Sequence, residues 1–239
     1  MAISRLPQDR WSWVEINQGA LRRNTRAFKN LLNPRQRLCC VVKADAYGHG
    51  AVACAKIMYA TGADMFAVAT VKEGVELREG GIVSPILLLS EPPAESIDLL
   101  LEHDIMPSVY TFEFALAYGE RASQLGKIGK YHMVIETGMN RIGVHYADVI
   151  EFRRSIHFHR GIQCDGVFTH FATADEQGGW DYKLQCKRFD EAVAAMKDAG
   201  FECGIVHCDN TPASILDPST HYDMIRAGIG LYGLQPCET

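Results

Sequence analysis

The sequence lacks long apolar runs, a surplus of positive charge and a leader-like N-terminus. No stretch of its 239 residues approaches the roughly 18 uninterrupted apolar residues that a membrane-spanning helix needs. The formal net charge is −5, whereas a protein that binds nucleic acid by charge needs a concentrated basic face. Met1 to Pro7 contain no apolar core of a secretory signal. We therefore expect a cytoplasmic protein that binds neither membranes nor nucleic acid.

Dinucleotide and metal motifs are missing as well. No Gly-x-Gly-x-x-Gly pattern follows an early apolar run, which argues against an open dinucleotide-binding sheet. The cysteines have neither disulfide-like nor zinc-like spacing and stand mostly inside apolar segments: Cys39, Cys40, Cys54, Cys164, Cys186, Cys203, Cys208 and Cys237. No pair of histidines has the spacing and companions of a metal site. We expect reduced core thiols and no catalytic metal.

Short, continuously apolar runs alternate with amphipathic stretches along the whole chain. Continuous hydrophobicity is typical of parallel strands that are covered on both faces. The predicted strands are 38–43, 65–69, 85–89, 105–109, 131–135, 164–169, 204–208 and 222–226. With 47% hydrophobic residues, the chain can bury one large core.

Helical patterns lie between these strands. The clearest runs from Asp181 to Ala199, with an apolar stripe at helical spacing, Asp181 as its predicted cap and Gly200 after its end. Thr70 and Glu73 form a capping-box pattern that predicts another helix start.

Strands alternating with helices predict an α/β protein with a single (β/α)₈ TIM barrel. No Pro/Gly/Ser-rich linker divides the chain. We expect residues 1–36 to form a lead-in, residues 37–233 the barrel, and residues 234–239 the start of a linker to a β domain that lies outside this sequence.

Polar residues gather where the predicted strands end, which is where barrel enzymes carry their active sites. Lys43 follows the first strand, His170 the sixth, and Arg226 ends the eighth. Residues 136–141 follow the fifth strand, and residues 210–211 the seventh. This pattern predicts one polar mouth.

Lys43 is the most informative of these residues. Its apolar neighbours disfavour a charged amine, which suits an amine that has to form an imine. The glycines at 48 and 50 permit a tight turn in which backbone amides or the phenol of Tyr47 meet an anion. The alternative is a lysine that only reaches from a strand end into water.

The other groups also allow two interpretations. Arg141, flanked by glycines, is either aimed at an anionic ligand or part of a surface ion pair. Asn210 and Thr211 either help to hold a phosphate or only cap a short helix that has Pro212 in its first turn. A lone histidine beside aromatic residues, such as His170, is more often a packing residue than a catalyst.

Several blocks resemble the alanine racemases, in the same order and over nearly the whole chain. The segment 41–50, Val-Val-Lys-Ala-Asp-Ala-Tyr-Gly-His-Gly, is similar to their cofactor-attachment motif almost letter for letter. Further matching blocks are 13–17, 137–143, 169–175 and 224–233.

The resemblance implies a function and a cofactor. The family interconverts L- and D-alanine with pyridoxal 5′-phosphate, which supplies D-alanine for peptidoglycan, and its members form homodimers. Lys43 would carry the cofactor as a Schiff base and act as one of two bases at Cα. The resemblance further assigns the phosphate to Tyr47, Asn210, Thr211, Gly228 and Ile229.

The same resemblance assigns residues to the cofactor ring. Arg141 would bind its phenolic oxygen and lie near the substrate carboxylate, and His170 would pack on the ring. Arg226 would face the pyridine nitrogen, where a permanent cation disfavours protonation and makes the ring a weaker electron acceptor.

Two departures from the family pattern stand out. Many members carry a lysine, carbamylated and bracing the arginine, where this chain has Val134, so Arg141 needs another brace. The family's chains also continue into a β-rich domain that supplies the second base from the partner subunit. This sequence ends at Thr239, so we expect the natural chain to be longer and these residues alone to be inactive.

Two alternatives stay open. A lone-barrel protein that binds pyridoxal phosphate without turnover has a similar length. A racemase acting on serine or another small amino acid would share the same barrel, since part of the substrate pocket lies in the second domain.

Overall fold

A computed structural model describes residues 12–176 and 178–236 of the chain. Its strands are short, and most are buried. They are β1 (Arg37–Val41), β2 (Met65–Val68), β3 (Ile86–Leu88), β4 (Ile105–Met106), β5 (Ser108–Val109), β6 (Gly129–Glu136), β7 (Val144–His145), β8 (Ile162–Phe168), β9 (Ile205–His207) and β10 (Met224–Ala227).

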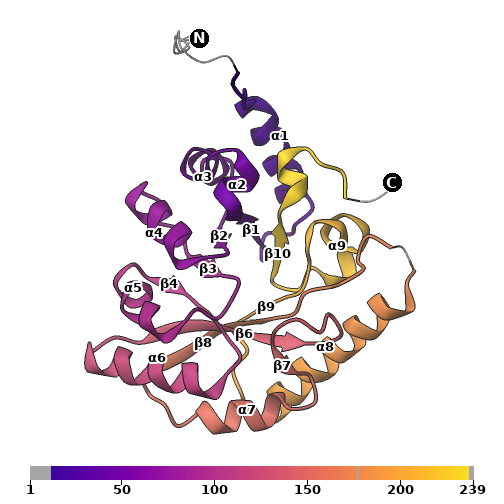
Figure 1. The fold of residues 1–239 in the computed structure, drawn as a ribbon. Helices are drawn as coiled ribbons and strands as arrows, with labels where there is room; N and C mark the ends of the chain where they lie inside the picture. The colour runs from indigo at the N-terminus through magenta and orange to yellow at the C-terminus, as the bar shows by residue number, and fades with distance from the viewer. Residues whose placement is uncertain (1–11, 177, 237–239) are drawn as a thin grey trace.

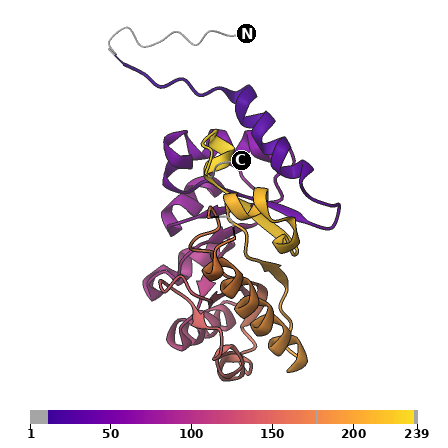
Figure 2. The ribbon, with the colours of Figure 1, turned by 90° about the vertical axis from the view of Figure 1, so that its right-hand side faces the viewer.

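Helices lie around the outside of the strands (Figure 1). The helices are α1 (Gln18–Asn30), α2 (Lys43–Gly48), α3 (Ala51–Tyr59), α4 (Val71–Glu79), α5 (Ile97–Glu102), α6 (Phe112–Gln124), α7 (Val149–Ile156), α8 (Trp180–Asp198) and α9 (Thr211–Leu216). Three short 3₁₀ segments are η1 (Ala94–Ser96), η2 (Pro218–Thr220) and η3 (Ile229–Tyr232). Helix α1 packs beside η3, where the Asn24 amide donates to the Leu231 carbonyl (3.0 Å; Figure 2).

The strands form two parallel sheets, ordered β10-β1-β2-β3-β4 and β5-β6-β8-β9, with β7 paired to β6. Alternate residues of β1 belong to two apolar clusters. Leu38 and Cys40 pack with the helices, whereas Cys39 and Val41 pack with Met65 and other residues from the opposite faces of the strands. Both faces are therefore dry, which is why these strands are apolar throughout.

The two sheets meet at two seams. Pro107 interrupts the predicted strand 105–109 because it has no N–H for the ladder, yet its carbonyl still accepts from His132 N–H (3.0 Å). At the other seam, Asp223 N–H donates to the Val206 carbonyl (3.0 Å) and Arg226 N–H to the Asp209 carbonyl (3.2 Å). The α/β class and the parallel strands are confirmed. Closure into one barrel stays a prediction, which these bonds support.

Each predicted strand overlaps an observed one, and the short strand β7 is additional. The capping box at Thr70 and Glu73 and the left-handed residue Gly200 (φ 81°) are confirmed. Asp181 was wrongly predicted as a cap: α8 starts one residue earlier, and the Asp181 carboxylate accepts from the Thr173 hydroxyl (2.6 Å).

Residues 1–11 of the predicted lead-in and residues 237–239 of the predicted linker, Cys237 included, lie outside the described residues. The cysteines of the described ranges are free thiols. Within the same ranges, no helix is long and apolar enough to cross a bilayer, and no group of three or more His, Cys, Asp or Glu side chains is placed to hold a metal ion.

Candidate functional site

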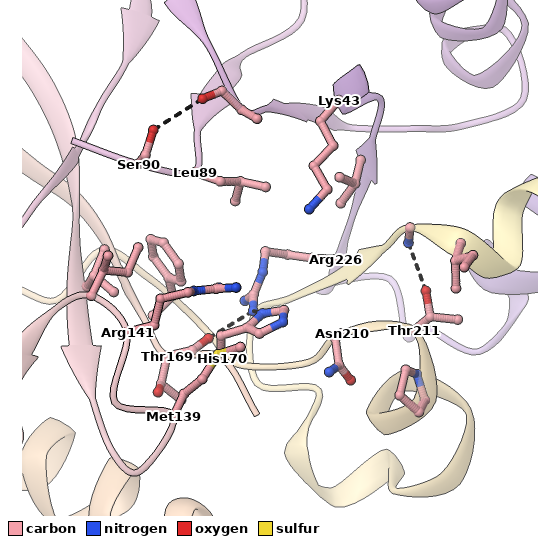
Figure 3. A pocket seen from close by; sticks show the side chains of 18 of the residues that line it. Lys43, Leu89, Ser90, Met139, Arg141, Thr169, His170, Asn210, Thr211 and Arg226 are labelled. Atoms are coloured by element: carbon pink, nitrogen blue, oxygen red, sulfur yellow. Dashed lines mark hydrogen bonds between the residues drawn. The ribbon is translucent and has the colours of Figure 1, made fainter. Parts of the chain in front are cut away.

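One cavity of about 500 Å³ lies at the C-terminal ends of the strands. Every site residue predicted from the sequence lines it: Lys43, Tyr47, Arg141, His170, Asn210, Thr211, Arg226, Gly228 and Ile229. Lys43, Arg141 and Arg226 approach it from three different strand ends and point toward the same space (Figure 3). Their location is thus as predicted, and their roles stay predictions.

The prediction that Lys43 ends the first strand is wrong. Strand β1 stops at Val41, and the segment labelled α2 is a left-handed turn, because Ala44, Asp45, Ala46 and Tyr47 all have φ between 52° and 55°. Left-handed backbone costs an L-residue roughly 1–2 kcal/mol and normally occurs at single positions. A run of non-glycine residues in this conformation therefore needs external support.

Two carboxylates provide that support. Glu73 accepts from Ala44 N–H (2.7 Å) through one oxygen and from Ala69 N–H (2.8 Å) through the other. Asp45 accepts from Ala51 N–H (2.7 Å) and so caps α3. Lys43 is consequently fixed to the end of β2 and to the start of α3. The sequence pattern predicted Glu73 only as part of a helix cap.

Tyr47, Thr211 and Gly228 meet at another wall of the cavity. The Thr211 hydroxyl accepts from Gly228 N–H (2.9 Å), and a Cβ atom on Gly228 would lie 2.9 Å from the Tyr47 hydroxyl. The Tyr47 ring packs on Tyr232, whose hydroxyl donates to the Val41 carbonyl (2.9 Å). The backbone and the hydroxyls approach closely here because residue 228 has no side chain.

Asn210 and Thr211 both lie at the start of α9, and Asn210 is the one that caps it. The Asn210 side chain caps α9 by accepting from Ala213 N–H (3.2 Å), and Pro212 stands in the first turn. The capping interpretation is therefore confirmed, and it leaves the Asn210 amide nitrogen to donate to the Phe171 carbonyl (3.3 Å).

Arg226 is buried and held from several sides. Its Nη2 donates to the carbonyls of Thr169 (2.8 Å) and Cys208 (2.9 Å) and lies 3.3 Å from Nδ1 of His170, while Nη1 lies 2.7 Å from Nδ1 of His207. Its guanidinium also lies over the Phe168 ring. Among the described residues, Nε has no hydrogen-bond partner.

Arg141 is held differently. Its backbone N–H donates to Glu136 (3.3 Å), but its guanidinium has no hydrogen-bond or ion-pair partner within the described parts of the chain. Val134, which stands where the resemblance places a lysine in many family members, lines the same cavity. The prediction was that an anion or a different side chain braces Arg141, and no side chain of the described residues does so.

Gln185 on α8 joins the loops that carry Arg141 and His170. Its side chain is 2% exposed. It accepts from Ala172 N–H (2.9 Å) and donates to the Thr137 hydroxyl (3.2 Å) and the His170 carbonyl (3.1 Å). No motif marks this residue, although a polar side chain within the apolar stripe of α8 was a signal that the sequence analysis missed.

Replacing Gln185 with leucine is expected to lower the free energy of unfolding by about 2–3 kcal/mol, because a buried N–H and a buried carbonyl lose their partner. Urea unfolding followed by circular dichroism measures the change. The exposed Gln163 provides the control, since Gln163→Leu should change stability by less than about 0.5 kcal/mol. Equal urea midpoints for the two variants would contradict the assigned role.

Three histidines near the cavity are held neutral. Burial, together with the charges of Arg226, Arg141 and Lys43, lowers the pKa of His170 to about 3. Burial is the main reason that the pKa of His132 falls to about 4. Burial and Arg226 lower the pKa of His207 well below its ordinary value.

These shifts predict a loss of stability in mild acid. Below pH 6.5 the unfolded chain protonates these histidines, whereas the folded chain does not until about pH 4 for His132. Each contributes on the order of 1.4 kcal/mol of destabilisation per pH unit within its window. Asp209 has the opposite effect on stability, because burial raises its pKa to about 6 and the folded chain therefore takes up its proton first. This single group does not outweigh the three histidines.

The urea concentration at the midpoint of unfolding should therefore decrease as the pH is lowered from 7 to 4.5. A His207→Gln variant should show a shallower slope, while His157→Gln, at an exposed position, should keep the original slope. A flat profile would show that these histidines titrate normally in the folded chain.

Relatives in the sequence comparison are alanine racemases. The chain is 42% identical over 224 residues to the alanine racemase of Carboxydothermus hydrogenoformans, covering 94% of this chain and 60% of that protein. It is 41% identical over 228 residues to alanine racemase 1 of Oceanobacillus iheyensis, with the same coverages. The chain thus spans about 60% of the length of these relatives.

Solved structures agree with the sequence comparison. The alanine racemase of Clostridium difficile 630 in complex with cycloserine superposes with a TM-score of 0.89 at 37% identity, covering 92% of this chain and 61% of that one. The Bacillus anthracis alanine racemase with bound L-Ala-P gives 0.90 at 32% identity, covering 97% and 60%. The family model for the alanine racemase N-terminal domain matches residues 16–236, and the chain belongs to that family.

Proposed function

We propose that the chain is the cofactor-binding part of a pyridoxal-phosphate-dependent alanine racemase. The observation that carries this proposal is the cation-lined cavity, in which an amine and two guanidinium groups face a shared space. Such a cavity is complementary to a phosphate ester and an amino-acid carboxylate. The relatives named alanine racemase support the reaction class.

The residues present fit the cofactor. Lys43 supplies an amine for its aldehyde. The unpartnered Nε–H of Arg226 matches an acceptor such as a pyridine nitrogen, and the space that a Cβ on Gly228 would fill lets an anion approach beside the Tyr47 hydroxyl. Asn210, Thr211 and Ile229 complete the wall on the phosphate side.

When bound, pyridoxal phosphate supplies an electron-accepting ring that stabilises negative charge at the Cα of an amino acid. The chain's own residues do the rest. Lys43 removes or returns the Cα proton on one face, and Arg141 orients the substrate carboxylate. His170, which is neutral and hydrogen-bonded to Arg226, would pack beside the bound ring. Arg226 would donate to the pyridine nitrogen and, as a cation, would oppose its protonation.

Racemisation needs a second base, because a proton must leave one face of Cα and arrive on the other. Besides Tyr47, which we assign to the phosphate, two other titratable groups of the cavity are already engaged. Glu136 accepts backbone N–H groups of Gly138 and Arg141, and His170 accepts from Arg226. We propose that residues outside this sequence, from a partner subunit of a homodimer, supply the second base.

Further parts of the interpretation are also proposals. We propose that the two sheets close into one (β/α)₈ barrel spanning residues 37–233, preceded by the lead-in 1–36 and followed at 234–239 by a linker. Alanine as the substrate, D-alanine supply for peptidoglycan and a cytoplasmic location stay predictions. Serine is the alternative substrate.

Hydrogen exchange at Cα tests the proposal. The chain and pyridoxal phosphate are incubated in D₂O with L-alanine and, separately, with D-alanine, and proton NMR and chiral chromatography follow the product. A single base serves one face of Cα, so deuterium should enter one of the two enantiomers with retention, much faster than the opposite enantiomer appears. Lys43→Ala should reduce exchange to the rate of free cofactor.

The outcomes separate the alternatives. D-Alanine formed as fast as deuterium is incorporated would place both bases within these residues. Cofactor binding without any exchange would favour a carrier of pyridoxal phosphate over an enzyme. Faster exchange with L-serine than with L-alanine would change the substrate and keep the reaction.

A further inference from the structure

Two buried histidines connect Arg226 on β10 to strand β6. His132 lies on β6, His207 on β9 and Arg226 on β10. Nδ1 of His132 is 2.8 Å from Nε2 of His207, whose Nδ1 is 2.7 Å from Nη1 of Arg226. Both imidazoles are fully buried. This series of contacts also crosses the seam between the two sheets, from β9 to β10.

As long as Arg226 bonds to His207, it sets the direction of both hydrogen bonds in this series. A guanidinium can only donate, so Nδ1 of His207 has to accept. His207 then carries its proton on Nε2 and donates to Nδ1 of His132. His132 must therefore carry its own proton on Nε2. Each ring is neutral and has one permitted tautomer.

At the far end of this series of hydrogen bonds, one donor of His132 is left without an acceptor. Nε2 of His132 is buried and has no hydrogen-bond partner among the described residues. A buried donor without a partner costs free energy, and an apolar side chain of similar shape would avoid that cost. What such a side chain cannot supply is the acceptor that faces His207.

The surrounding residues are shaped for these rings. A Cβ on Gly166 would lie 2.5 Å from Cε1 and Nδ1 of His132, so residue 166 admits the imidazole only as glycine. Phe168 stacks on His207 with ring centroids 4.8 Å apart and planes 12° apart. The same phenyl ring lies under the Arg226 guanidinium, 5.1 Å from its centroid.

We infer that His132, acting through His207, is a positioning residue for Arg226. By accepting from His207 Nε2, it holds that ring in the one neutral tautomer that Arg226 can bond. The guanidinium then keeps Nη1 and Nη2 on protein acceptors and presents Nε–H to the cavity. The role of Arg226 toward the cofactor rests on the proposed function, whereas the tautomers of the two histidines follow from the hydrogen bonds alone.

Two substitutions separate positioning from packing. His132→Phe keeps the ring shape and removes the acceptor, while His132→Asn restores an oxygen near the position of Nδ1. Affinity is measured for pyridoxal phosphate and for its 1-deaza analogue, in which C–H replaces the pyridine nitrogen. His157→Phe, at an exposed position, is the control.

We expect His132→Phe to weaken binding of pyridoxal phosphate about tenfold, the factor of one ordinary net hydrogen bond, and to leave the deaza analogue unaffected. His132→Asn should recover most of the affinity. Equal weakening for both cofactors, or none for either, would overturn the inference. Thermal unfolding confirms that each variant is folded.

Nitrogen-15 NMR of the imidazoles tests the tautomers without any cofactor. At pH 7 both rings should be neutral and protonated on Nε2, and His132→Phe should shift His207 toward the other tautomer. His207 protonated on Nδ1 in the unmodified chain would overturn the inference. If the unmodified chain binds neither cofactor, the proposed function fails. The His207 tautomer in His132→Phe still decides whether His132 positions His207.

Discussion

Borohydride reduction of the chain loaded with pyridoxal phosphate is expected to fix the pyridoxyl group to Lys43. The Lys43→Ala variant should retain none of it, because the amine that faces the cavity is gone. This is a complete loss of covalent attachment rather than a graded effect. Peptide mass spectrometry after reduction identifies the modified residue, and the absorbance of the loaded chain reports attachment before reduction.

Lys72 provides a matched control for this experiment. It is exposed in the first turn of α4, next to the Glu73 that supports the Lys43 turn. Lys72→Ala should therefore keep full labelling at Lys43. Label found on another lysine would refute the assignment. Loss of all labelling in Lys72→Ala would show that the variant disturbs the turn.

A proline at position 44 should have the second largest effect, a loss of about 3 kcal/mol or more in the free energy of unfolding. Proline fixes φ near −65°, whereas Ala44 has φ 52°. It also lacks the N–H that Ala44 donates to Glu73. Urea unfolding measures the stability, and labelling at Lys43 measures the damage to the site.

Glycine at the same position is the informative comparison. Ala44→Gly should stabilise the chain by up to about 1 kcal/mol, because relief of the left-handed backbone exceeds the entropy that glycine adds to the unfolded chain. In an ordinary right-handed helix the same change costs about 1 kcal/mol. A destabilised glycine variant would therefore contradict the left-handed turn.

Most of the strand core was predictable because its residues obey one simple constraint. A parallel strand covered on both faces has to be apolar at consecutive positions, and segments such as 65–69 and 85–89 show this directly. Pro107 divides one predicted strand because a single missing N–H interrupts the ladder without changing the hydrophobic pattern. The two-residue strand β7 carries too short a pattern to be predicted.

The site was predictable to the extent that its residues follow strand ends or match a motif. The left-handed turn was not, because Ala and Tyr carry no local preference for positive φ and Asp only a weak one, and the turn depends on Glu73 from another element. His132 was missed for a related reason, because its partner His207 lies far along the chain and one sequence shows no such pairing. Gln185 did leave a signal, a polar side chain within the apolar stripe of α8, but its partners on the two loops cannot be read from that signal.

The left-handed turn also bears on affinity. Ordering a residue's backbone costs roughly 1–2 kcal/mol, and a ligand that has to immobilise a flexible segment binds more weakly by that amount. Glu73 and Asp45 restrict the backbone after Lys43 during folding, so Lys43 is preorganised before any ligand arrives.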